Sequence, residues 1–228
     1  NMDGYADLLV RPKNKFECAI ILKTCYNCNI LLTISAGKTN LTGSATPRGG
    51  IILSTSLLTE PDIELDLENK DASAPTGIPL EDFRNRVLEI SDQKLYYPVD
   101  PTSRNDAYVG GTLSCNASGF IPGQKGATRY WVKELEFLLP NGDLVHIKRG
   151  QYISENGIFS LDYEGKTISL PVPTYNRPKI KNASGIFSDE NGIVDLIDLI
   201  IGSEGILGII TSCKLGLTDY PKENLELF

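Results

Sequence analysis

The sequence contains very little histidine and no long apolar run. His146 is the only histidine, so the chain cannot form a multi-histidine metal site, and we expect no metal centre. No stretch of roughly 18 apolar residues occurs, which argues against a membrane-spanning helix. Lys and Arg total 22 against 29 Asp and Glu, giving a net charge of −7. Such an acidic chain lacks the basic face that nucleic-acid binding requires.

Cysteines are few, odd in number and without the spacing of a disulfide framework. This pattern favours reduced thiols and a cytoplasmic protein. Cys25 and Cys28 form the motif "CYNC", but one such pair cannot close a four-ligand zinc site, so we interpret it as structural. The five cysteines are Cys18, Cys25, Cys28, Cys115 and Cys213.

The first part of the chain alternates strand and helix patterns. Residues 7–12 form a short apolar run that ends at Pro12, and residues 14–29 have apolar positions at helical spacing behind a capping Asn14. Residues 30–34, "ILLTI", then predict a buried strand. Together these segments predict a βαβ unit.

The remainder mixes helices and strands, which predicts an α+β fold. We expect a long surface excursion over residues 149–192, where Gly, Asn, Ser and Pro cluster. We expect a hairpin over residues 130–147 that contains Tyr130, Trp131 and His146. The two aromatic rings are expected to pack against neighbouring residues, and His146 is expected on the strand surface. The expected strands are 49–55, two within 62–75, 95–99, a hairpin over 130–147 and the end of 202–217, and the expected helices are 79–90, 109–119 and 193–200.

The stretch "SAGKTNLTG", residues 35–43, contains the Gly-Lys-Thr that ends a phosphate-binding P-loop. The first glycine of that motif would fall at position 32, which is Leu32, and the glycines and Pro47 that follow prevent a helix. An ATP site is therefore disfavoured. Two interpretations remain open for the loop itself: an anion-binding loop of backbone N–H groups, or an ordinary tight turn.

Three segments in order resemble the FAD-binding domain of the vanillyl-alcohol oxidase and p-cresol methylhydroxylase (PCMH-type) family, in the branch of D-lactate and glycolate dehydrogenases. They are "SAGKTNLTGSATP" (35–47), "PVDPTSRNDAYVGGTLSCNASG" (98–119) and "IGSEGILGIIT" (201–211). The resemblance implies a two-subdomain PCMH-type FAD-binding domain over residues 1–217, with subdomains at about 7–58 and 59–217. Residues 218–228 would begin a linker to a substrate domain that this chain lacks.

The resemblance also implies which residues contact FAD. The first segment matches a loop around the pyrophosphate, the second matches contacts to the ribityl chain and phosphates, and the third matches the adenosine end. A helix beginning at Val109 would direct its N-terminus at phosphate. The matched residues are Ile34, Ser35, Ala36, Gly37, Lys38, Thr39 and Asn40, then Thr102, Ser103, Val109, Gly110, Gly111, Cys115, Asn116, Ala117 and Ser118, and finally Glu204, Gly205, Gly208, Ile209 and Ile210.

Departures from the family pattern refine these expectations. Lys38 stands where the family has a third glycine, and we expect its side chain to face solvent. Thr39 occupies the position at which some relatives carry a flavin-linked histidine, so we expect non-covalent FAD.

The resemblance implies an FAD-dependent oxidoreductase that oxidises a 2-hydroxy acid of the lactate or glycolate type, or a related alcohol, by hydride transfer. The small-molecule substrate would be held by the absent domain, and peripheral contact with a membrane stays open. The alternative is an interaction module that retains the fold without the cofactor.

Overall fold

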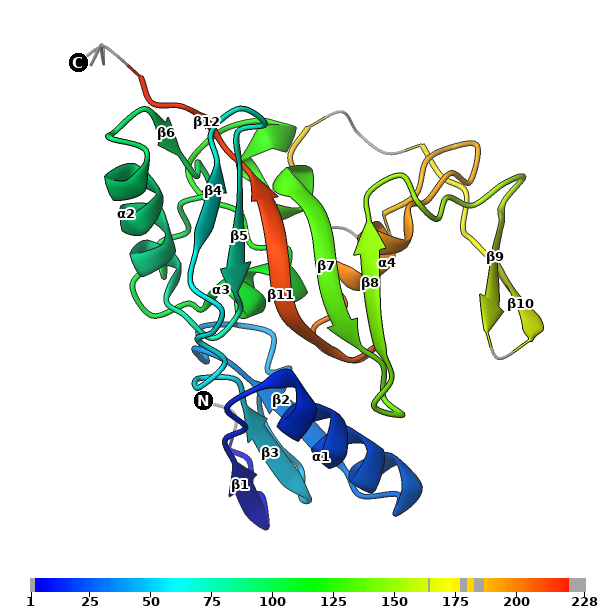
Figure 1. Ribbon diagram of the computed structural model, residues 1–228. Coiled ribbons are helices and arrows are strands. Elements are labelled where there is room, and N and C mark those ends of the chain that lie inside the picture. The colour runs from blue at the N-terminus through cyan, green and yellow to red at the C-terminus, as the bar shows by residue number, and fades with distance from the viewer. Residues whose placement is uncertain (1–2, 164, 177–179, 183–186, 222–228) are drawn as a thin grey trace.

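The computed structural model describes residues 3–163, 165–176, 180–182 and 187–221, and it contains two main sheets stacked end to end (Figure 1). The smaller sheet belongs to the N-terminal subdomain, which comprises the elements from β1 to β3. The larger sheet belongs to the second subdomain, which begins at β4. Both helices and strands are present in each subdomain, as the α+β prediction requires.

The N-terminal subdomain is a parallel sheet of order β1-β3-β2 with one helix against it. The predicted βαβ unit is present, but β3 is inserted between its two strands. Asn14 caps the helix by accepting a hydrogen bond from the Glu17 N–H at 3.0 Å, and Cys18, Leu22 and Cys25 form its buried stripe. The elements are β1 Leu8–Val10, α1 Lys15–Asn27, β2 Leu32–Ser35 and β3 Ile51–Ser54.

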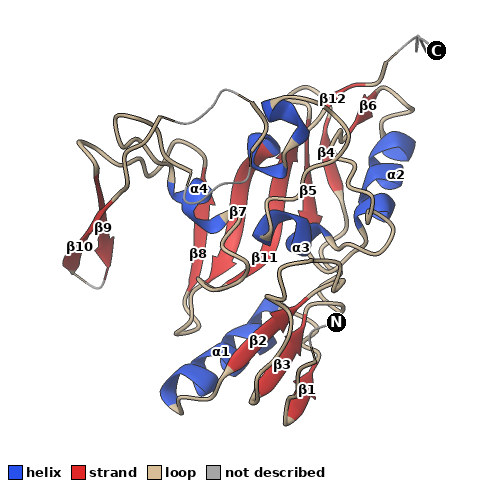
Figure 2. Ribbon diagram, turned by 180° about the vertical axis from the view of Figure 1, so that it is seen from behind, coloured by secondary structure: helices blue, strands red, loops and turns tan. Residues whose placement is uncertain are grey.

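The second subdomain is built on an antiparallel sheet of order β4-β5-β11-β7-β8. Figure 2 shows α3 and α4 lying over one face of this sheet, and Leu80, Phe83 and Val87 of α2 join the same core. The predicted hairpin of β7 and β8 and the predicted pair of β4 and β5 are confirmed. The elements are β4 Glu64–Asp66, β5 Asp71–Pro75, α2 Leu80–Ile90, α3 Val109–Ser114, β7 Val132–Leu138, β8 Leu144–Lys148, α4 Leu196–Ile200 and β11 Ile209–Gly216.

The predicted surface excursion over residues 149–192 contains regular structure that the sequence analysis missed. Strands β9 (Ile158–Tyr163) and β10 (Lys166–Pro171) pair antiparallel and project from the body of the domain (Figure 1). Apolar and polar residues alternate only over 159–163 and 167–170, and the glycines and asparagines around the strands obscure that short pattern. Residues 177–179 and 183–186 of this excursion lie outside the described part of the chain.

Residues 128–131 and 218–219 also form structure that differs from the sequence-based prediction. Tyr130 and Trp131 lie in the 3-10 helix η2 (Thr128–Trp131), directly before the hairpin rather than in it; a further 3-10 turn, η1, covers Gln124–Gly126. Strand β12 (Thr218–Asp219), at the start of the expected linker, pairs with β6 (Leu95–Tyr96). Residues 222–228 of that linker lie outside the described residues.

Candidate functional site

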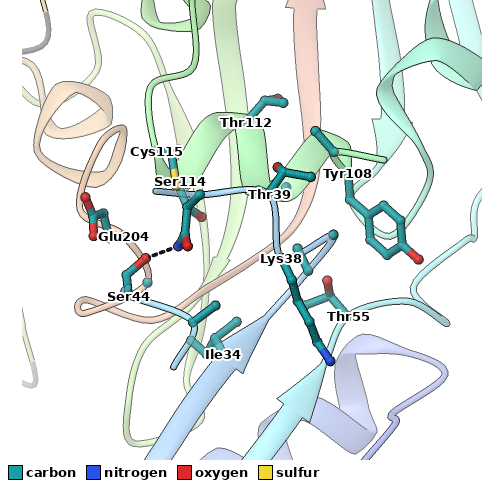
Figure 3. A pocket seen from close by; sticks show the side chains of 18 of the residues that line it. Ile34, Lys38, Thr39, Ser44, Thr55, Tyr108, Thr112, Ser114, Cys115 and Glu204 are labelled. Carbon is teal, nitrogen blue, oxygen red and sulfur yellow. Dashed lines mark hydrogen bonds between the residues drawn. The ribbon is translucent and has the colours of Figure 1, made fainter. Parts of the chain in front are cut away.

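A cleft lies where the carboxyl ends of β2 and β3 face α3 of the second subdomain (Figure 3). Its N-terminal wall is the loop that follows β2, and its other wall is formed by α3 and the turn before β11. The lining residues are Ile34, Ala36, Gly37, Lys38, Thr39, Asn40, Ser44, Ala45, Thr55, Ser103, Ala107, Tyr108, Gly110, Gly111, Thr112, Ser114, Cys115, Ala117, Glu204, Gly205, Gly208, Ile209 and Ile210.

The loop after β2 lines this cleft and contains a row of backbone N–H groups that have no hydrogen-bond partner in the described part of the chain. Within the described residues, none of the consecutive N–H groups from Ala36 to Asn40 donates a hydrogen bond to another part of the chain. Lys38 adopts a left-handed conformation with φ of 58°, which bends the loop. Successive N–H groups on such a bend form an anion-binding concavity without requiring a positive side chain. The loop is therefore suited to a phosphate group.

Two glycines of the cleft pack closely against neighbouring segments of the chain. A Cβ on Gly37 would lie 1.9 Å from the carbonyl oxygen of Asp106, and a Cβ on Gly110 would lie 2.8 Å from Cβ of Thr76. Neither position tolerates a side chain without movement of its neighbours. Gly37 therefore lets the β2 loop pack directly against the backbone of Asp106, and Gly110 lets α3 pack against Thr76.

The start of α3 differs from the expectation. The N–H groups of Val109 and Gly110 donate to the carbonyls of Ile78 and Thr76, both at 2.9 Å. They are therefore not available to a phosphate, and the prediction of a phosphate-facing helix start is wrong at these two positions. These two hydrogen bonds attach the start of α3 (Val109–Ser114) to the neighbouring 76–78 segment.

The described residues that line the cleft include one basic residue, Lys38, and one acidic residue, Glu204, which come from different walls. Figure 3 shows the Lys38 side chain pointing away from Cys115 and Glu204, and Lys38 is exposed. Glu204 accepts a hydrogen bond from the Thr42 hydroxyl at 3.1 Å, so its carboxylate lies beside residue 42, beyond the end of the Ala36–Asn40 row. Burial, and secondarily the Glu204 carboxylate, raises the pKa of the Cys115 thiol above its usual value.

We predict that replacing Lys38 with glycine stabilises the protein. A left-handed conformation costs a non-glycine residue about 1 to 2 kcal/mol, whereas glycine adopts it freely at an entropic cost of about 0.5 to 1 kcal/mol. The free energy of unfolding in urea should rise by about 0.5 to 1 kcal/mol. Lys23→Gly in the middle of α1 is the control and should lower stability by about 1 kcal/mol. Equal losses in both variants would contradict the strain at Lys38.

The structure brings most of the sequence-predicted site residues into this one cleft. Their assignment as cofactor contacts stays a prediction. Five of them do not line the cleft. Val109 and Ser35 are buried, Thr102 and Ser118 are exposed, and the Asn116 side chain is buried behind the wall.

Several lining residues were not predicted from the sequence. Ser114 lies three residues after Gly111 and on the same helical face, so a helix projection would have found it. Thr55 follows β3, whose carboxyl end meets that of β2 at the same sheet edge because the strands are parallel. Ser44, Ala45, Ala107, Tyr108 and Thr112 complete the set.

Other candidates from the sequence lie outside the cleft. His146 is 57% exposed on β8 and contacts Glu134 at 3.2 Å, as expected for a strand surface residue. Trp131 donates from Nε1 to the Lys125 carbonyl at 2.7 Å and packs edge-on against Tyr130. All five cysteines are free, and no His, Cys, Asp and Glu group suited to a metal ion occurs among the described residues.

The family model described as "FAD binding domain" matches residues 6–148. A D-lactate dehydrogenase of Anaerostipes hadrus is 29% identical over 97% of this chain and 38% of its own length. A D-2-hydroxyglutarate dehydrogenase of Xanthomonas citri is 30% identical over 92% and 36%, and glycolate oxidase subunit GlcD of Bacillus subtilis is 27% identical over 97% and 39%. The chain therefore spans well under half the length of these relatives.

Solved structures share the fold. The glucooligosaccharide oxidase of Acremonium strictum superposes with a TM-score of 0.65, covering 95% of this chain and 36% of that protein at 14% identity. This confirms the predicted PCMH-type fold. Within the described part of the chain, no helix has the length and apolarity needed to cross a membrane.

Proposed function

Because the chain belongs to the FAD binding domain family, we propose that it binds FAD in the cleft between the β2 loop and α3. The observation that carries this proposal is the row of unbonded N–H groups from Ala36 to Asn40. These donors suit the pyrophosphate, which is the charged part of FAD. They would supply hydrogen bonds to an anion without requiring a positive side chain.

The charges in the cleft suggest how FAD is oriented. The Glu204 carboxylate would repel a phosphate placed beside it, so the pyrophosphate belongs at the Ala36–Asn40 loop and an uncharged part of FAD belongs near Glu204. This is consistent with the adenosine end that the family resemblance implies for residues 204–210. Glycines 37, 110, 111, 205 and 208 all line the cleft, so the cofactor would meet backbone rather than side chains at these positions.

We further propose that FAD is held without a covalent bond. Thr39 has no ring nitrogen with which to attach a flavin, and His146 is on β8 outside the cleft. Cys115 does line the cleft, but its raised pKa keeps the thiol protonated and a poor nucleophile. Denaturing the loaded protein should therefore release all of its FAD.

The reaction class we propose is the oxidation of a 2-hydroxy acid. The relatives named as D-lactate dehydrogenase, D-2-hydroxyglutarate dehydrogenase and glycolate oxidase subunit support it. Bound FAD would accept a hydride from the substrate carbon. This domain would position the flavin and determine its electrostatic surroundings. The substrate would be a small molecule held by a further domain. We also propose a cytoplasmic location, for which the five free cysteines are the support.

Alkylation of Cys115 tests the cleft assignment. In a Cys28→Ser background every other thiol is buried, so Cys115 is the thiol that a small maleimide should modify. We predict that FAD slows this modification about tenfold or more because the cofactor covers the thiol. Since the pKa of Cys115 is raised, the rate without FAD should increase as pH rises above neutrality. An unchanged rate in saturating FAD would place the cofactor elsewhere.

The substrate class is tested with the natural protein in which this domain occurs. Loaded with FAD and mixed anaerobically with D-lactate, glycolate or D-2-hydroxyglutarate, it should lose its visible flavin absorbance with at least one of them. Persistence of the oxidised flavin with all three would contradict the proposed substrate class but not the binding of FAD.

A further inference from the structure

Asn116 lies in the wall of the cleft, but its side chain points away from the cavity. Its neighbours Cys115 and Ala117 both line the cleft, whereas Asn116 is only 6% exposed and does not. Its backbone is left-handed, with φ of 46°, and its Oδ1 accepts a hydrogen bond from the Arg129 N–H at 3.0 Å. The amide oxygen therefore has a structural partner behind the wall.

The Arg129 side chain in turn forms hydrogen bonds to Asp198 and Ile201, at the end of α4. Its guanidinium donates to the Ile201 carbonyl at 2.6 Å, to the Asp198 carbonyl at 2.6 Å and to Oδ1 of Asp198 at 3.0 Å. Arg149 contacts Oδ2 of the same carboxylate at 3.0 Å. A buried arginine with these fixed acceptors has little freedom to move, so it holds the end of α4 in place.

Ile201 directly precedes the turn that carries Glu204 and Gly205 into the cleft. The Gly202 N–H donates to the Leu113 carbonyl at 3.2 Å, and the Glu204 N–H donates to the Ser114 carbonyl at 2.8 Å. Arg129 and Asn116 therefore connect the end of α3 and the 202–205 turn from behind. A shift of either residue would move both parts of the wall.

We propose that Asn116 is a positioning residue for the cofactor, which acts through Arg129 and does not touch FAD. This inference rests on the proposed binding of FAD in the cleft. The Oδ1 atom of Asn116 is the essential group, because it accepts from the Arg129 N–H and fixes Cys115 and Ala117 at the cavity surface. The Nδ2 group of Asn116 is not required.

Two substitutions separate positioning from contact. Asn116→Asp keeps an acceptor oxygen, keeps the shape and places its charge beside Arg129, so FAD affinity should fall by less than about threefold. Asn116→Gly keeps the left-handed backbone but loses the acceptor and leaves a buried N–H unpaired, so affinity should fall about tenfold or more. Asn156, which is exposed with φ of 51°, provides the matched controls Asn156→Asp and Asn156→Gly, and neither should change affinity.

The measurement is the dissociation constant of FAD from quenching of flavin fluorescence, with the visible spectrum of bound flavin and thermal unfolding of the FAD-free proteins. A large loss of affinity in a folded Asn116→Asp protein overturns the proposal, since an amide that donates to FAD cannot be replaced by a carboxylate. Unchanged affinity in Asn116→Gly overturns it as well. Failure of the unmodified protein to bind FAD contradicts the proposed function instead, so the two failures are distinguishable.

Discussion

Replacing Gly37 with alanine is expected to weaken FAD binding by about 100-fold, which corresponds to about 2.7 kcal/mol. The new Cβ would lie 1.9 Å from the Asp106 carbonyl oxygen, and that oxygen belongs to the backbone and cannot rotate away. The loop from Ala36 to Asn40 must then move away from the opposite wall, and its unbonded N–H groups move with it. Isothermal titration with FAD measures the change.

Gly216→Ala is the matched control for an added methyl group. Gly216 is in β11, outside the cleft, and its Cβ would meet nothing closer than 3.5 Å. FAD affinity should remain at the value of the unmodified protein. Tight FAD binding in a folded Gly37→Ala protein would show that the loop does not hold the cofactor by close backbone contact.

Replacing Asp198 with alanine is expected to lower the free energy of unfolding by about 3 to 5 kcal/mol. Asp198 is 7% exposed and its carboxylate lies between Arg129 and Arg149, so its removal leaves buried positive charge without its counter-ion. Removing one partner of a buried pair costs far more than the pair itself contributes. Urea unfolding followed by circular dichroism measures this loss.

Asp219→Ala is the control for loss of an ion pair at the surface. Asp219 contacts Lys70 at 2.7 Å, but its side chain is 71% exposed, so the loss of stability should be below about 1 kcal/mol. Similar small losses in both variants would mean that water compensates the charges around Asp198, contrary to the burial described above.

Local sequence patterns were sufficient to predict the helices and hairpins that have a clear apolar spacing or turn motif. The helix predicted over 79–90 matches α2 to within one residue, and the hairpin predicted over 130–147 is present as β7 and β8. Strands β6 and β12 have only two residues each, and pairing between distant segments defines them. The insertion of β3 between β1 and β2 is likewise a tertiary property that no local pattern contains.

The candidate site was predictable in position but not in hydrogen bonding. The three motifs identified the segments that meet at the cleft. They did not reveal that Thr76 and Ile78 accept the N–H groups of Gly110 and Val109, because those acceptors belong to a distant segment without a motif. The sequence also does not determine whether the Asn116 side chain points into the cleft or away from it. Its hydrogen-bond partner, the Arg129 N–H, is recognisable only in the folded chain.

The most direct test of the central claim is retention of FAD by the folded chain. The protein is incubated with excess FAD and passed over a desalting column, and its visible absorbance is then compared with its protein concentration. We expect equimolar flavin, recovered in full as free FAD after denaturation. A folded chain that emerges without flavin would contradict the cofactor site in the cleft and favour an interaction module that retains the fold alone.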